Sequence, residues 1–210
     1  VLDELRSAGW AVQHGPEIDP ESEHPERIDY REVVLAPRLH AAVARLNPQL
    51  DADAIDDVVK TVVRPESQVV MSENWRVYQL LTQGVPVETR DADGNPRTIR
   101  ARLVDWADAA ANDLVAVNQF SIVSASGSKR RPDIVLFVNG LPLVLIELKR
   151  AGNQGSSLQG AFNQVKTYVN DIPDLFAFVQ FAVISDGVQA RAGAFTAAWE
   201  HYAPWKTIEG

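Results

Sequence analysis

The 210-residue chain contains no cysteine and only one methionine. Without cysteine, neither disulfides nor thiolate-bound zinc and iron–sulfur sites can contribute to its fold. No apolar run approaches the roughly 20 residues that a membrane-spanning helix needs, and the first residues do not read as a secretory signal. These absences favour an intracellular protein, and we expect a cytoplasmic one that has no membrane partner.

Basic residues are also in short supply, because 20 Lys and Arg stand against 28 Asp and Glu, for a net charge of −8. Neutralised phosphates supply most non-specific affinity for nucleic acids, so this balance argues against strong free-standing DNA binding. The chain also lacks the phosphate-cradling pattern G-x-x-x-x-G-K-[ST]. We therefore expect that this segment neither binds nor hydrolyses ATP by that route.

The order of the predicted elements favours an α/β fold, and 46% hydrophobic residues allow one sizeable core. Residues 1–84 read as mostly helical, and residues of about 85–200 read as a sheet-containing core. A helix is expected between an apolar hairpin and a strand at Phe176–Ile184, as parallel pairing requires, and a last helix follows. A further strand is expected at Asp113–Val123. We predict a single domain over 1–210, a mixed central sheet flanked by helices.

The apolar hairpin lies within the stretch Arg131–Arg150, whose interior carries only three charged residues, Asp133, Glu147 and Lys149. Ionised groups on strands this apolar are costly to bury unless something compensates them, and a divalent cation is a natural compensator. Two carboxylates on neighbouring strands, with a lysine two residues after the second, indicate a metal-dependent phosphodiesterase site. The alternative is a solvated strand rim, with an Asp that begins one strand and a Glu-x-Lys that ends the next.

The hairpin register tests that interpretation. Asn139-Gly140 is typical of a two-residue turn because both residues tolerate a positive φ. A two-residue turn alone would turn Glu147 to the face opposite Asp133, since side chains alternate along a strand. A metal site at these carboxylates therefore requires a loop of odd length or a β-bulge.

Basic residues gather around the same hairpin, as Lys129, Arg130 and Arg131 precede Asp133 and Arg150 follows Lys149. Between 129 and 150 the chain has five basic and two acidic residues, in contrast to its overall acidity. Such a focus suits a polyanion near the acids. The alternative is that Lys and Arg simply flank a buried hairpin.

A helical pattern at Leu158–Val169 carries Gln164 and Tyr168 one turn apart, and therefore on one face. An amide and a phenol together can hold a carboxylate, a lysine or a phosphate by hydrogen bonds. An ordinary amphipathic helix with Gln and Tyr on its polar side is the alternative.

Taken together, Asp133, Glu147-x-Lys149 and Gln164-x-x-x-Tyr168 resemble the PD-(D/E)xK nuclease superfamily, in the RecB-like branch that adds Q-x-x-x-Y. More narrowly, the chain resembles the N-terminal nuclease domain of the restriction (R) subunit of type I restriction-modification enzymes. The matching segments are L-A-P-R-L-H-A-A-V-A-R-L-N-P (35–48), V-N-Q-F (117–120), R-R-P-D-I-V-L-F-V-N-G-L-P-L-V-L-I-E-L-K (130–149), A-F-N-Q (161–164), I-S-D-G-V-Q-A-R (184–191) and P-W-K-T-I-E-G (204–210).

The resemblance implies a restriction-endonuclease-like core and Mg²⁺-dependent hydrolysis of phosphodiester bonds in double-stranded DNA. It implies that Asp133, Glu147 and the backbone carbonyl of Leu148 hold the metal, and that Lys149 orients or deprotonates the attacking water. Gln164 and Tyr168 would position the site or contact the DNA backbone. Nucleases of this branch also carry an acid on the first helix. Glu4 is the nearby candidate, and a solvent-facing helix residue is its alternative reading.

The resemblance further implies a fragment of a longer subunit, in which ATP-driven translocase domains follow Gly210. The partners would then be those domains and the modification and specificity subunits, and ATP would serve only the translocase. Two other classes remain open at this point. One is a catalytically silent DNA-binding or subunit-docking module, and the other is a stand-alone nuclease.

Overall fold

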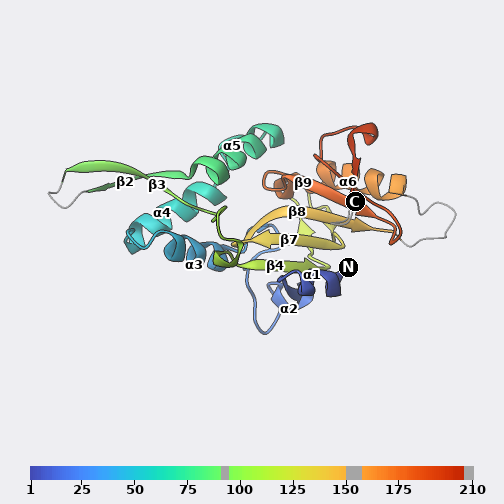
Figure 1. Cartoon of the computed structure of the whole chain (residues 1–210), viewed down its shortest axis with the longest axis horizontal. Helices are drawn as coiled ribbons and strands as arrows, with labels where there is room; N and C mark the ends of the chain where they lie inside the picture. The colour runs from blue at the N-terminus through green and yellow to red at the C-terminus, as the bar shows by residue number, and fades with distance from the viewer. Residues whose placement is uncertain (91–94, 150–157, 206–210) are drawn as a thin grey trace.

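A computed structural model describes residues 1–90, 95–149 and 158–205 of the chain. Its centre is a seven-stranded sheet in the order β1-β4-β7-β8-β9-β10-β11 (Figure 1). Its strands are β1 Ala11–His14, β4 Leu114–Asn118, β7 Ile134–Val138, β8 Leu141–Leu148, β9 Phe181–Ser185, β10 Ala190–Gly193 and β11 Ala203–Pro204. β1 and β4 pair in parallel, as do β8 and β9, and the other neighbours are antiparallel. The predicted mixed sheet with flanking helices is confirmed.

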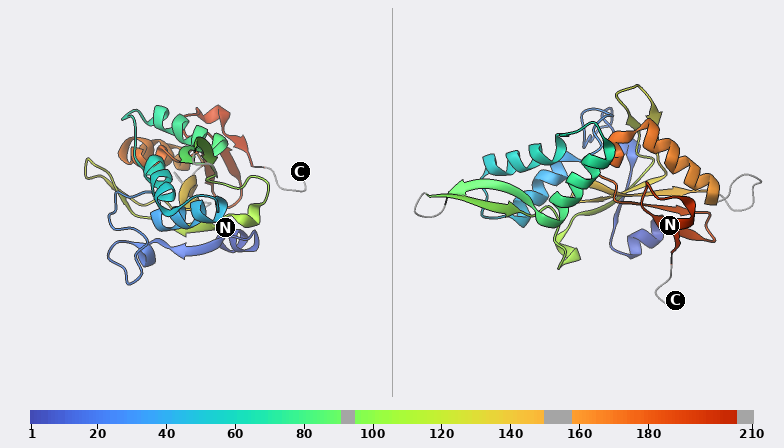
Figure 2. Two further views of the ribbon diagram at one scale, coloured as in Figure 1. Left: turned by 90° about the vertical axis from the view of Figure 1, so that its left-hand side faces the viewer. Right: turned by 90° about the horizontal axis from the view of Figure 1, so that it is seen from above.

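Two small sheets lie beside the large one. β2 Val85–Arg90 and β3 Pro96–Ala101 form a hairpin that extends away from the central sheet, at the left of Figure 1. β5 Ile122–Val123 pairs with β6 Lys129–Arg130 just before β7. The β2–β3 hairpin lies at the same end of the molecule as α3, α4 and α5, as the right-hand view of Figure 2 shows.

The helices are α1 Leu2–Ser7, α2 Gly15–Ile18, α3 Ala36–Leu46, α4 Ala52–Val63, α5 Val70–Gln83, α6 Leu158–Asp171 and α7 Pro173–Phe176, with 3-10 turns η1 Ala109–Ala111 and η2 Trp199–His201. α4 shows why they form: Ile55, Val58 and Val62 recur at helical spacing and are buried. The Asp51 carboxylate caps its first turn by accepting a hydrogen bond from the Ala54 N–H at 2.9 Å. No helix within the described residues is long and apolar enough to cross a membrane.

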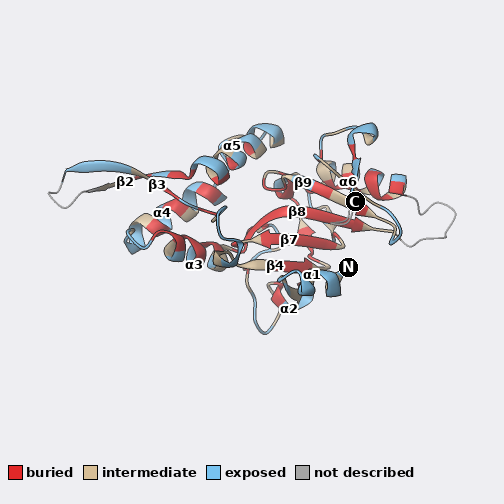
Figure 3. Cartoon of the chain, viewed as in Figure 1, coloured by how far each residue is buried: buried red, intermediate tan, exposed pale blue. Residues whose placement is uncertain are grey.

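α6 and α7 connect β8 to β9, the crossover that the parallel pair of strands requires. α6 packs against β8 and β9, with Phe162, Val165 and Tyr168 on its buried side. The central strands β4, β7 and β8 are the most thoroughly buried strands of the large sheet, whereas β1, β10 and β11 are partly or fully exposed (Figure 3).

Three predicted elements are wrong in type or extent. The strand expected at Asp113–Val123 ends at Asn118, because Gln119 has φ 60° and breaks the pleat. The strand expected at Phe176–Ile184 starts only at Phe181, since the residues before it form α7 and its following turn. The expected last helix is absent from the described residues up to 205, where β10 and β11 extend the sheet instead.

The turn between β7 and β8 is held by side-chain hydrogen bonds and by close packing against the start of α3. Asn139 (φ 53°) and Gly140 (φ 80°) form the two-residue turn, and Asn139 is fully buried. Its amide nitrogen donates to the Leu103 carbonyl at 2.8 Å, and its amide oxygen accepts from the Asp113 N–H at 2.8 Å. A Cβ on Gly140 would lie 2.5 Å from the carbonyl oxygen of Leu35, so only glycine fits there.

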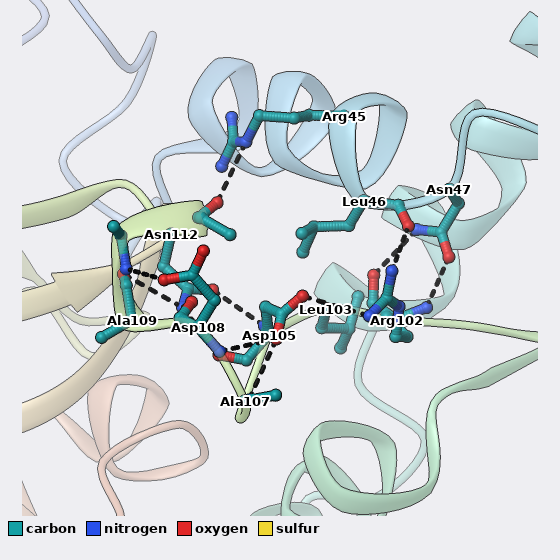
Figure 4. A network of polar contacts seen from close by, with 12 residues as sticks. Arg45, Leu46, Asn47, Arg102, Leu103, Asp105, Ala107, Asp108, Ala109 and Asn112 are labelled. Carbon is teal, nitrogen blue, oxygen red and sulfur yellow. Dashed lines mark hydrogen bonds and ion pairs between the residues drawn. The ribbon is translucent and has the colours of Figure 1, made fainter.

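The connection from β3 to β4 surrounds this turn with further polar contacts (Figure 4). The Asn112 side chain donates to the Asp105 carbonyl at 2.8 Å and accepts from the Asp105 N–H at 2.9 Å. Asn47, at the end of α3, donates to the Arg102 carbonyl at 2.9 Å and accepts from the Arg102 N–H at 2.7 Å. This end of the hairpin is thus a satisfied polar network that joins α3, the β3–β4 connection and the β7–β8 turn.

Candidate active site

A β-bulge sets the register of the two site strands. Phe137 pairs with Pro142, but its neighbour Leu136 pairs with Val144, so Leu143 is an extra residue in β8. The loop itself has two residues, and the bulge supplies the odd residue that a shared face requires. The sequence required either a loop of odd length or a β-bulge for the two carboxylates to share a face, and the structure has the β-bulge.

Beyond the bulge, Ile134 pairs with Ile146, which places Asp133 opposite Glu147 at the open end of the hairpin. The Asp133 carboxylate accepts a hydrogen bond from the backbone N–H of Leu148 at 2.8 Å. Asp133 thus reaches across to β8 beside Glu147. The two predicted carboxylates converge on one edge of the sheet.

Glu147 is the most constrained acid of the site, with only 3% of its surface exposed. One carboxylate oxygen, Oε1, accepts a hydrogen bond from Lys149 Nζ at 2.9 Å. The other, Oε2, is buried and has no hydrogen-bond partner within the described part of the chain. A buried carboxylate oxygen without a partner is unfavourable in a folded protein and suits a ligand that it has yet to bind.

Electrostatics agree with that geometry. Burial raises the pKa of the Glu147 carboxyl, and the negative charge of Asp133 raises it further, while the hydrogen bond and charge of Lys149 act in the opposite direction. The Lys149 backbone is fixed to β9, because its N–H donates to the Ser185 carbonyl at 2.8 Å. The site therefore holds two acids whose mutual repulsion one lysine only partly relieves.

The α6 residues face the same acids. Tyr168 is 5% exposed, and burial raises the pKa of its phenol, which the negative charges of Glu147 and Asp133 raise further. The phenol therefore stays protonated and can donate a hydrogen bond. Gln164, one turn earlier and half-buried, acts in the opposite direction on the Tyr168 pKa. α6 thus brings both predicted residues next to one another and Tyr168 within electrostatic reach of the carboxylates.

A cleft of about 610 Å³ opens at this edge of the sheet. Asp133 and Lys149 lie in its wall, and the other lining residues are Val1, Leu2, Asn118, Gln119, Ile134, Leu148 and Gly187. From the sequence, Asn118 and Gln119 of the V-N-Q-F segment could either touch DNA or the active site, or simply be polar residues that flank the strand pairing. The available signal was a polar pair that interrupts an apolar strand next to the site strands.

The basic triplet is only partly free to meet a polyanion. Arg130 is committed to an ion pair with Asp171 at the end of α6, at 2.6 Å. Lys129 Nζ lies 5.0 Å from the centre of the Tyr30 ring. Arg131 is exposed. Lys129 is exposed as well, and Arg131 has no ion pair or ring contact within the described residues; Arg150 lies outside them.

Glu4 is not part of the cleft beside Asp133, as far as the described residues show. Its side chain is 85% exposed and lies 3.5 Å from the amino group of Val1. Val1 and Leu2 line the cleft, whereas Glu4 is not among the described lining residues. Its position corresponds to the solvent-facing alternative.

The donor set is compatible with a hard divalent cation. No group of three or more His, Cys, Asp or Glu side chains is placed to hold a metal within the described residues. Mg²⁺, however, is commonly held by one or two carboxylates and completes its shell with water and substrate oxygens. The unpartnered Oε2 of Glu147 beside Asp133 provides such a minimal set.

Comparison with known sequences relates the chain to the R subunits of type I restriction enzymes. The family described as "Type I restriction enzyme R protein N terminus (HSDR_N)" matches residues 1–201. The chain is 40% identical over 209 residues to the Type I restriction enzyme HindI endonuclease subunit of Haemophilus influenzae. It is 31% identical over 211 residues to the putative type I restriction enzyme MjaIXP endonuclease subunit of Methanocaldococcus jannaschii.

Both alignments include 100% of this chain but only 20% of each relative, so the chain spans about a fifth of the length of the curated relatives that it matches. A 41% identical match over 81 residues to a Staphylococcus aureus type I restriction enzyme endonuclease subunit covers 38% of the chain. Because the family match extends over nearly the whole chain, the protein belongs to the family of type I restriction enzyme R protein N-terminal domains.

Proposed function

We propose that this chain is a Mg²⁺-dependent endonuclease domain that hydrolyses phosphodiester bonds in double-stranded DNA. The observation that carries the proposal is Glu147, a buried acid with one free oxygen that lies beside Asp133 on two aligned strands. The printed names of the relatives, endonuclease subunits of restriction enzymes, support the same chemistry.

Asp133, Glu147 and the backbone carbonyl of Leu148 would hold the ion. A bound Mg²⁺ supplies Lewis-acid activation of water and charge neutralisation at the phosphate. Lys149, held by Glu147 at 2.9 Å, orients the water and donates to the phosphate oxygens that gain negative charge. Water adds to phosphorus and gives up one proton, one P–O ester bond breaks, and the leaving oxygen takes up a proton to become a hydroxyl group.

Gln164 and Tyr168 act from α6 as positioning residues. The Tyr168 phenol, kept protonated by its surroundings, donates toward the carboxylates and restrains Glu147. Arg131, exposed just before Asp133, is the basic residue of the triplet best placed for a DNA phosphate.

The wider assignment follows from the family resemblance. We propose that the domain works in a cytoplasmic complex with modification and specificity subunits, in which translocase domains of the same subunit use ATP. Sequence recognition would then belong to the partners, consistent with a chain whose net charge is −8.

The test is nicking of supercoiled plasmid by the complete enzyme that carries Glu147→Gln. This isosteric change removes the charge but keeps the shape, so cleavage should fall at least about 100-fold while ATP hydrolysis persists. Glu23→Gln, which alters an exposed acid in the α2–α3 loop, is the matched control and should cleave normally. Cleavage by Glu147→Gln at the control rate would leave a silent DNA-binding or docking module as the better description.

A further inference from the structure

One residue of the cleft has an unusual backbone. Within the described residues, only Gln119 and Asn139 have a positive φ without being glycine. The positive φ of Asn139 is explained by the turn, where both its side-chain oxygen and its side-chain nitrogen are hydrogen-bonded. Gln119 has φ 60°, yet its side-chain amide has no hydrogen bond within the part of the chain that the structure describes.

The backbone of Gln119 is nevertheless held tightly. Its N–H donates to the Asp133 carbonyl at 3.0 Å, which extends the β4–β7 ladder to the site acid itself. From the other side Gly15 approaches so closely that a Cβ there would lie 2.4 Å from the Gln119 carbonyl oxygen. The Gln119 N–H is thus held by Asp133, and its carbonyl side is closely packed against Gly15.

The residues that follow Gln119 are anchored as well. Phe120 is fully buried, packs edge-to-face on Phe137, and lies under the Arg27 guanidinium at 3.9 Å. Arg27 is itself buried, is paired with Asp19, and donates to the Ser121 carbonyl at 2.6 Å. A strained conformation persists where the surroundings over-determine it, and such positions cluster where ligands bind.

The side-chain amide of the preceding residue, Asn118, contacts another part of the protein. The Asn118 side-chain oxygen lies 3.3 Å from His14 Nδ1 across the β1–β4 pair, so Asn118 has a protein partner. Among the described residues, Gln119 therefore presents the amide without a partner in the cleft wall, next to Asp133 and directly after β4, the strand adjacent to the site hairpin.

From this arrangement we infer that Gln119 is a substrate-contact residue, whose amide N–H donates to a DNA phosphate oxygen next to the bond that is cut. The inference rests on the proposed nuclease function. An amide on a rigid loop fits a phosphate oxygen because it adds a directed donor without adding charge.

The decisive variant is Gln119→Gly, which relieves the backbone strain and removes only the side chain. In the complete enzyme we expect an unchanged or higher melting temperature, normal ATP hydrolysis, and a single-turnover cleavage rate lowered about 10-fold or more, the loss of one hydrogen bond to a charged group. Gln119→Asn, which tolerates this φ and keeps a shorter amide, should restore part of the rate. Gln68→Gly, at an exposed amide in the α4–α5 connection, is the matched control.

Glu147→Gln in the same assay separates the two proposals. If Glu147→Gln fails to cleave while Gln119→Gly cleaves like the parent, the nuclease assignment stands and the role of Gln119 is overturned. A fall in the melting temperature of Gln119→Gly would assign the residue to the fold and would equally overturn it. Cleavage by Glu147→Gln at the parental rate removes the nuclease assignment, and the inference about Gln119 with it.

Discussion

At the turn of the β7–β8 hairpin, the Asn139 side chain is fully hydrogen-bonded, whereas at the open end Glu147 keeps a buried oxygen without a partner among the described residues. Both ends hold a polar residue in a nearly sealed environment, and both have a non-glycine residue with positive φ at or beside them. Folding alone explains the turn, since every polar group there finds a partner inside the protein. At the open end, one buried oxygen of Glu147 has no partner among the described residues, as our proposal of a metal ligand there requires.

The largest effect is expected on cleavage, from substitutions of Lys149 at the open end of the hairpin. Lys149→Met removes the Nζ that contacts Glu147 Oε1 at 2.9 Å, and we expect plasmid cleavage to fall about 100-fold or more. Lys149→Arg keeps the charge but not its compact geometry, so it should recover only part of the rate. Circular dichroism of each variant checks that the fold is retained. A Lys149→Met enzyme that cuts at the parental rate would remove the lysine from the site.

The next largest effect is expected in stability, at the turn. Asn139→Gly still permits the positive φ but leaves the Asp113 N–H and the Leu103 carbonyl without their partner. We expect the free energy of unfolding to drop by about 3 kcal/mol, because buried polar groups lose their hydrogen bonds. Denaturant titration measures this directly. Glu147→Gln should in contrast leave stability unchanged or raise it, since it removes a poorly compensated buried charge.

If both substitutions lowered stability alike, the two ends would not differ in the way described.

A smaller effect on the free energy of unfolding is expected at acid pH. It comes from Arg38, near the turn, which forms ion pairs with both Glu26 and Asp113. Burial alone would raise the pKa of Glu26, but its hydrogen bonds and ion pair with Arg38 outweigh this and lower it below the ordinary value. A depressed carboxyl pKa stabilises the fold at neutral pH, and the contribution disappears as pH falls through the folded-state pKa.

Glu26→Gln should therefore cost about 1 kcal/mol at pH 7 and nearly nothing once pH is well below 4. Unfolding titrations of parent and variant across this range measure the convergence. Parallel curves for the two proteins, with a constant gap down to low pH, would contradict the assignment.

Much of the open end could be predicted from the sequence. The apolar run around Asp133 and Glu147 fixes their strands, and side-chain alternation requires an odd residue between them if they share a face. The position of that residue, Leu143, could not be predicted, because a bulge depends on how the whole strand twists against its neighbours.

Other features depend on contacts distant in sequence. The left-handed conformation of Gln119 occurs where the chain packs against Gly15 and bonds to Asp133, and no residue within V-N-Q-F predicts it. The predicted last helix was wrong because the segment extends the sheet edge: β10 pairs with β9, and Gly193 packs against the buried Tyr202 ring. Tertiary pairing overrode the local pattern there.

The central claim, that the open end is completed by a metal ion, is tested most directly by titrating Mg²⁺ or Mn²⁺ into the protein and following thermal unfolding. An ion that binds only the folded state raises the melting temperature in proportion to its occupancy. We expect a concentration-dependent rise for the parent and a much smaller one for Asp133→Asn and Glu147→Gln. Equal rises in all three proteins would place the ion elsewhere and contradict a metal site at these two carboxylates.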